Sequence, residues 1–169
     1  MKYQEPLLLF HQENGKLRNV SRDAGPAFAK SYPARGLAVG DFNNDGLPDV
    51  LIGSNGGAPV LLRNQSNTEN HWLGLKLEGV TCNRDAIGAE IELVTAKRRQ
   101  LAIVTTASSY LSSSDKRVHF GLGVEKVART IKIRWPSGIL QTLSNVSADQ
   151  ILQVDEPDKG DLPISPGKP

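Results

Sequence analysis

The segment GDFNNDGLPDVLIG, residues 40–53, places oxygen-bearing side chains at alternate positions of a short loop. Hard cations such as Ca²⁺ take about six to eight oxygen ligands, and a short loop supplies them by turning alternate side chains inward. Glycine at position six of the loop permits the sharp turn that this arrangement needs. The spacing predicts a calcium site whose ligands are Asp41, Asn43, Asp45, the carbonyl of Leu47, and Asp49.

Two other interpretations of this loop compete with calcium. An EF-hand needs flanking helices and a glutamate at position twelve, where this chain has Ile52, so the loop is not an EF-hand. An ordinary turn is also built from Asp, Asn and Gly. Against the turn, three carboxylates within residues 41–49 repel one another unless a cation neutralises them. Magnesium fits less well, because it prefers fewer protein ligands and keeps its waters.

The elements around the loop follow the two-residue period of β-strands. The loop lies between LAVG and VLIG, which predict a strand on each side. In HWLGLKLEG, residues 71–79, the leucines alternate with other residues, and TIKIRW, residues 130–135, repeats the pattern with Ile131 and Ile133 facing inward. Helical periodicity is nearly absent, so the sequence predicts an all-β fold.

Three turns connect predicted strand pairs. Asn14-Gly15 joins LLLF, residues 7–10, to KLRNV. TAKRR forms a charged tip between AEIELV and QLAIVTT. WPSG, residues 135–138, has Pro and Gly where a tight turn places them.

The chain divides at the polar, non-periodic stretch NQSNTEN, residues 64–70. Residues 1–67 are predicted to form partial propeller repeats, 68–156 a small antiparallel β-sandwich or barrel-like domain, and 157–169 a flexible Pro- and Gly-rich tail. A weak internal repeat matches Pro6, Leu8, Leu9 and Gln12 with Pro59, Leu61, Leu62 and Gln65. The first region then begins within a repeat, and an incomplete ring of blades leaves strand edges open to pairing with another copy of the chain.

Composition excludes several classes of partner. The 169 residues include 38% hydrophobic and 22% charged residues, as in a globular protein. The net charge of +2 is dispersed along the chain, so no nucleic-acid partner is expected. The apolar runs are too short for direct membrane insertion, which needs about 20 residues. The single cysteine, Cys82, is expected to be an unreactive thiol.

Several separated motifs together resemble known families. GLAVGDFNNDGLPDVLIGSNGGAPVLLRN resembles the FG-GAP or VCBS repeats of integrin-like β-propellers. NHWLGLKLEG, NRDAIGAEIEL, SSYLSSSDKRVHFGLG and IRWPSGILQTL resemble the ASPIC/UnbV domain of the cartilage acidic protein-like family. The resemblance implies a C-terminal piece of a longer secreted, cell-surface or periplasmic protein. It also implies a calcium loop formed by Asp41, Asn43, Asp45, Leu47 and Asp49, and no established catalytic activity.

The function expected from these features is non-enzymatic: a calcium-binding extracellular module for recognition, adhesion or structural assembly, with an extracellular protein or glycan as its ligand. The alternative is an accessory binding domain of a larger exported enzyme. A hydrolase would have to use His119, Asp115 and a serine of residues 108–114, but no G-x-S-x-G pattern is present. Trp72 and Trp135 are expected in core or interdomain packing rather than in a sugar-binding platform.

Overall fold

The structure is a computed structural model that describes residues 3–158. Its first part contains two small paired units and two short 3₁₀ helices. One unit pairs β1 with β4, and the other is the hairpin of β2 and β3. The elements are β1 Glu5–Pro6, β2 Phe10–Glu13, β3 Lys16–Asn19, η1 Ser21–Asp23, η2 Pro26–Ala29 and β4 Ser31–Tyr32.

The hairpin turn at Asn14-Gly15 is confirmed, but its first strand lies later than predicted. Both turn residues have positive φ, +50° and +76°, as a two-residue type I′ turn requires. Such a turn forces Glu13 to pair with Lys16, so β2 is Phe10–Glu13, and residues 7–9 of the predicted strand are irregular. The internal repeat is not reflected in the strands, since Leu8 and Leu9 are irregular whereas Leu61 and Leu62 lie in a strand.

A three-stranded antiparallel sheet follows, in the order β5-β6-β7. Its strands are β5 Ala34–Gly40, β6 Asp49–Ser54 and β7 Val60–Leu62. The pair Gly40–Asp49 closes the connection between β5 and β6, so residues 41–48 form a loop anchored at both ends by strands. The predicted strand-loop-strand arrangement is confirmed.

The second part is a β-sandwich of two sheets. One sheet has the order β10-β9-β12-β13 and the other β11-β8-β14. Leu73 and Leu75 from one sheet and Ile131 and Ile133 from the other are fully buried in one apolar cluster, which defines the core. The strands are β8 His71–Glu78, β9 Glu90–Val94, β10 Arg99–Ile103, β11 Val118–Gly123, β12 Val127–Arg134, β13 Leu140–Ser147 and β14 Gln150–Asp155.

The alternation and turns predicted for this part are confirmed. Strands β9 and β10 pair as a hairpin around TAKRR, and Gly138 in WPSG has φ +88° and donates its N–H to the carbonyl of Trp135 at 2.9 Å. One pair differs from a purely antiparallel sandwich, because β14 runs parallel to β8. The connection that makes this possible passes through the other sheet.

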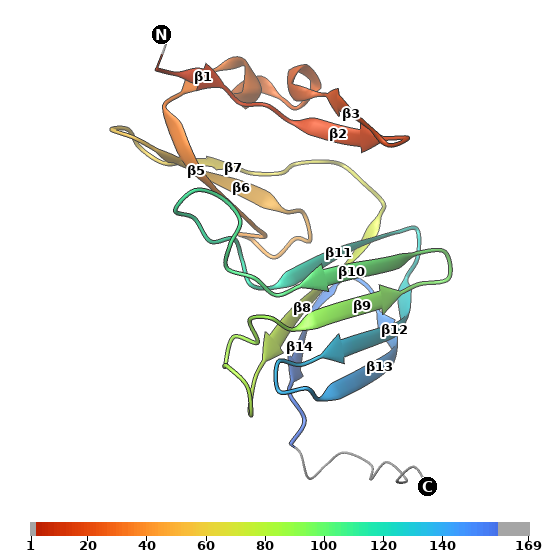
Figure 1. Cartoon of the computed structure of the whole chain (residues 1–169). Coiled ribbons are helices and arrows are strands. Elements are labelled where there is room, and N and C mark those ends of the chain that lie inside the picture. The colour runs from red at the N-terminus through yellow and green to blue at the C-terminus, as the bar shows by residue number, and fades with distance from the viewer. Residues whose placement is uncertain (1–2, 159–169) are drawn as a thin grey trace, which may run out of the picture.

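The two parts lie end to end in Figure 1, and the loop between β10 and β11 extends from the sandwich to the side of β5. Within residues 3–158, no helix is long and apolar enough to span a membrane. Most of the predicted flexible tail, residues 159–169, lies outside the described residues.

Candidate metal site

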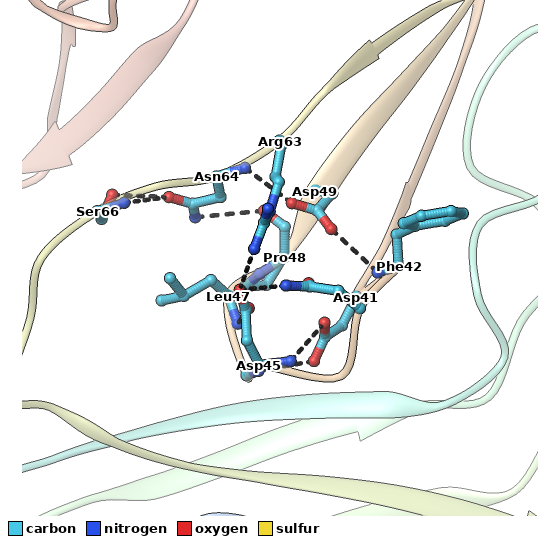
Figure 2. A network of polar contacts seen from close by, with 11 residues as sticks. Asp41, Phe42, Asp45, Leu47, Pro48, Asp49, Arg63, Asn64 and Ser66 are labelled. Atoms are coloured by element: carbon cyan, nitrogen blue, oxygen red, sulfur yellow. Dashed lines mark hydrogen bonds and ion pairs between the residues drawn. The ribbon is translucent and has the colours of Figure 1, made fainter.

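The buried member of the predicted ligand set is Asp49, the first residue of β6, which is 3% exposed. Its Oδ2 accepts a hydrogen bond from the Phe42 N–H at 3.0 Å, and its Oδ1 accepts one from the Asn64 N–H at 2.7 Å (Figure 2). A buried carboxylate is costly without such partners. Asp49 therefore joins the start of the loop to the chain that follows β7.

Asp41 closes the first half of the loop. Its two carboxylate oxygens accept the N–H groups of Asp45 at 3.1 Å and Gly46 at 2.8 Å (Figure 2). Asn44 and Gly46 have φ values of +58° and +82°, which bring these N–H groups back toward Asp41. Glycine and asparagine tolerate this left-handed conformation best, so the local sequence favours the turn that the loop makes.

Asp45 is the exposed carboxylate of the set. Its carboxylate accepts hydrogen bonds from the Asn43 amide at 2.6 Å and the Leu47 N–H at 2.9 Å, and it lies 3.8 Å from the Arg63 guanidinium. The hydrogen bond from Asn43, followed by the one from Leu47, lowers the pKa of Asp45 below its ordinary value. The side chain is therefore ionised at neutral pH.

The described loop has the hydrogen bonds of an Asx-rich turn and the oxygen donors of a calcium loop. Within residues 3–158, no three His, Cys, Asp or Glu side chains are gathered as a metal ion requires. The chemistry of the donor set nevertheless suits a hard cation: three carboxylates, an amide and the Leu47 carbonyl. Each carboxylate has about four acceptor positions, so those on Asp41, Asp45 and Asp49 keep free lone pairs. In the structure the amide nitrogen of Asn43 faces Asp45. To act as a cation ligand, Asn43 has to rotate its amide so that the oxygen takes this position.

Three residues of the sandwich contact the loop, and no sequence pattern links these residues to the loop. Arg117 donates to the side-chain oxygen of Asn44 and the carbonyl of Asp41. His119 bonds to the Gly46 carbonyl and stacks on Trp72. Trp72 thus lies in interdomain packing, as predicted, and Trp135 lies in the core at 1% exposure.

The residues of the hydrolase hypothesis are bonded to other partners. His119 Nε2 lies 2.8 Å from the Gly46 carbonyl, so this nitrogen is a donor and not a base. Asp115 Oδ2 lies 2.6 Å from Nε of Arg117. Ser114 accepts the Val39 N–H through its hydroxyl oxygen. These contacts join the two parts of the chain and leave the three side chains without a nucleophile–base pairing.

Comparison with protein families identifies the two parts. Residues 34–68 match the FG-GAP repeat, which covers β5 to β7 and the loop, and residues 79–161 match the ASPIC and UnbV family. The FG-GAP match identifies the three-stranded sheet as part of a propeller blade. The chain thus combines an FG-GAP repeat with an ASPIC and UnbV domain.

The chain is related to proteins named Cartilage acidic protein 1. It is 28% identical over 152 residues to the protein from Xenopus tropicalis, covering 85% of this chain and 23% of that relative. The proteins from Mus musculus and Homo sapiens are 25% and 27% identical, with 90% and 88% of this chain covered. The chain spans 22% to 24% of the length of these three relatives.

Proposed function

We propose that this chain is a non-enzymatic, calcium-binding module of an extracellular protein, with a role in recognition, adhesion or structural assembly. The observation that supports it most is the loop of residues 41–49, whose oxygen donors are attached to two strands and anchored by the buried Asp49. Bound calcium would neutralise the mutual repulsion of the loop carboxylates. The extracellular location rests on the relatives named for cartilage, a tissue made largely of matrix outside cells.

Calcium is expected to stabilise the folded chain. A ligand that binds only the folded state at about 100 times its Kd adds about 2.7 kcal/mol. For a chain of this size that corresponds to a rise of several degrees in Tm, roughly 5 to 10 °C. Isothermal titration calorimetry in millimolar calcium, with thermal unfolding in calcium and in EDTA, measures both the binding and the stabilisation.

The matched variants for this test are Asp45→Ala and Asp23→Ala. Asp45 belongs to the donor set, whereas Asp23 is an exposed aspartate in η1, outside the loop. We expect Asp45→Ala to abolish the calcium-dependent rise in Tm and Asp23→Ala to keep it. Absence of calcium binding by the unmodified chain, or an equal rise in Tm in Asp45→Ala, would show that the loop is only a hydrogen-bonded turn.

The partner we propose is an extracellular protein or glycan. In its support, the β5-β6-β7 sheet leaves two directly paired apolar side chains exposed on one face, Leu51 at 47% and Leu61 at 46%. Exposed apolar groups of this kind often mark interaction surfaces. A protein and glycan binding screen with and without EDTA is expected to yield partners whose binding depends on calcium. Hits that all ignore EDTA would argue against a role for the loop in shaping the binding surface.

A further inference from the structure

Arg117 of the ASPIC and UnbV domain donates two hydrogen bonds to the loop of residues 41–49. Its Nη1 donates to Asn44 Oδ1 at 2.6 Å, and its Nη2 donates to the Asp41 carbonyl at 2.9 Å. The two acceptors lie at the first and fourth positions of the loop. Neither belongs to the proposed ligand groups, so Arg117 holds the loop without using a cation ligand.

Arg117 is itself held in place by its own segment and by β5. Asp115 Oδ2 lies 2.6 Å from Nε and 2.5 Å from Nη2 of Arg117. The Asp115 N–H donates to the Val39 carbonyl at 2.9 Å, and the Ser114 hydroxyl oxygen accepts the Val39 N–H at 3.0 Å. Val39 lies two residues before Asp41 in the chain. The same segment therefore fixes the strand that leads into the loop and the arginine that contacts the loop.

A second contact fixes the middle of the loop. The His119 Nε2 lies 2.8 Å from the Gly46 carbonyl, and the His119 ring stacks on the Trp72 indole with centroids 5.8 Å apart and planes 8° from parallel. A Cβ placed on Gly46 would lie 2.0 Å from the indole nitrogen, so Trp72 packs directly on the loop backbone. The ASPIC and UnbV domain thus holds the loop at Asp41, Asn44 and Gly46.

We propose that Arg117 is a positioning residue for the cation loop, and that cation binding and docking of the ASPIC and UnbV domain strengthen each other. The inference rests on the proposed calcium function. Ordering a residue's backbone costs conformational entropy, so a loop already held at its backbone binds a cation with less ordering still to be done. Linkage between two equilibria is reciprocal, so a bound cation stabilises the docked domain by the same factor.

The positive charge of Arg117 opposes cation binding, whereas its positioning of the loop favours cation binding. The geometry decides which of these two effects is larger. A guanidinium beside a cation site repels the cation. Here the Oδ2 atom of Asp115 contacts both Nε and Nη2 of Arg117, so the pair is neutral as a unit. The repulsion is therefore small in the unmodified chain. Loss of Arg117 leaves the Asp115 carboxylate unpaired, which by itself favours a cation, so weaker calcium binding in Arg117→Ala reports the loss of positioning.

Calcium titration of the full chain by calorimetry tests this inference. We expect Arg117→Ala to weaken calcium binding by at least about fivefold, the lower end of typical coupling between sites. Asn44→Gly removes the side-chain acceptor on the loop and still suits the φ of +58°, and we expect a similar weakening. The double variant, Arg117→Ala with Asn44→Gly, should bind calcium no more weakly than whichever single variant binds it less well. This is expected when two residues are partners in one contact. The matched control is Arg134→Ala. Arg134 is exposed and pairs with Glu90 on the neighbouring strand of the β10-β9-β12-β13 sheet, away from the loop.

Acrylamide quenching of tryptophan fluorescence gives a readout of docking. The chain has two tryptophans, and Trp135 is 1% exposed in the core, so quenching reports on Trp72. Calcium should lower the quenching of the unmodified chain, and Arg117→Ala should raise it in the absence of calcium. Circular dichroism checks that Arg117→Ala is folded, and Asn44→Gly carries the test if it is not.

The outcomes separate the two proposals. No calcium binding by the unmodified chain overturns the proposed calcium site and this inference together. Equal calcium affinity in the unmodified chain, Arg117→Ala and Asn44→Gly overturns this inference and leaves the calcium site standing. Tighter binding by Arg117→Ala also overturns it, because charge repulsion would then outweigh positioning.

Discussion

Replacing Gly46 with alanine is expected to destabilise the chain by about 3 kcal/mol, whereas the same change at Gly56 is expected to cost about 1 kcal/mol. Both glycines have left-handed backbones, with φ values of +82° and +73°. An L-residue pays about 1 to 2 kcal/mol for this conformation. The loss of stability in Gly56→Ala therefore measures the cost of the left-handed backbone alone, since a Cβ there would meet nothing within 4 Å.

The additional cost at Gly46 comes from the indole of Trp72. An added Cβ would lie 2.0 to 2.4 Å from three atoms of the indole, which is far inside van der Waals contact. Relief requires the indole to move away from the loop, which breaks its stacking on His119. Overpacking of this kind typically costs about 1 to 3 kcal/mol. The excess over Gly56→Ala is therefore about 2 kcal/mol.

Urea unfolding followed by circular dichroism measures this difference and applies equally to variants that lack Trp72. A second variant isolates the cause: Trp72→Ala removes the obstacle, so adding Gly46→Ala to it should cost only the backbone term of about 1 kcal/mol. Equal losses for Gly46→Ala and Gly56→Ala in the unmodified background would show that Trp72 does not press on the loop.

The local features of the site were predictable from sequence because they depend on neighbours in the chain. The positions of Asp41, Asp45 and Asp49 between two apolar strands define the loop and its ends. The same holds for Asn14-Gly15 and for the turn ending at Gly138, where the φ sign needed by the turn selects the residue type. Alternation likewise located the buried face of β8, since a strand buried on one side repeats every second residue.

The contacts between the two parts were not predictable, because they join residues far apart in the chain. Arg117 and Asn44 are separated by 73 residues, and no periodicity or turn preference relates them. His119 and Asp115 are the residues that a hydrolase would have had to use, a hypothesis that the sequence already disfavoured for lack of a G-x-S-x-G pattern. The structure gives each a partner that helps to join the domains: the Gly46 carbonyl for His119 and Arg117 for Asp115. A residue's own chemistry does not reveal which distant partner it meets.

Glu156 is a second residue whose importance depends on distant contacts. It follows β14 and is 3% exposed. Its Oε2 accepts the N–H groups of Val80, Thr81 and Cys82 at 2.8, 2.7 and 2.9 Å, and its Oε1 accepts the Ser137 hydroxyl. The carboxylate therefore fastens the end of β14 to the loop after β8 and to the turn between β12 and β13.

Replacing Glu156 with glutamine is expected to destabilise the chain by about 3 kcal/mol at pH 7. Burial alone opposes ionisation of Glu156, but the hydrogen bonds from Ser137 and from the backbone at Cys82 and Val80 outweigh it and lower the pKa from 4.5 to about 2. Because the folded-state pKa lies below the ordinary value, the unfolded chain takes up the proton first as pH falls. The stabilisation is complete above about pH 5 and is lost as pH falls toward 2.

Urea unfolding at several pH values between 7 and 3 measures this effect. The difference in stability between the unmodified chain and Glu156→Gln should shrink as pH falls below about 4.5. Glu90→Gln is the matched control, because Glu90 is a glutamate of the same domain whose side chain is 61% exposed. We expect this control to change stability by less than about 1 kcal/mol.

Cys82 provides an independent readout of the same carboxylate. Burial and then the adjacent Glu156 raise the pKa of the Cys82 thiol to about 11. The unmodified chain should therefore react with iodoacetamide at pH 7.5 about 100 times more slowly than the urea-unfolded chain, because the thiolate is the reactive form. In Glu156→Gln the negative charge is lost while burial remains, so alkylation should become faster but stay below the unfolded rate. If stability falls while Cys82 reactivity is unchanged, Glu156 acts only as a hydrogen-bond acceptor and its charge does not reach the thiol.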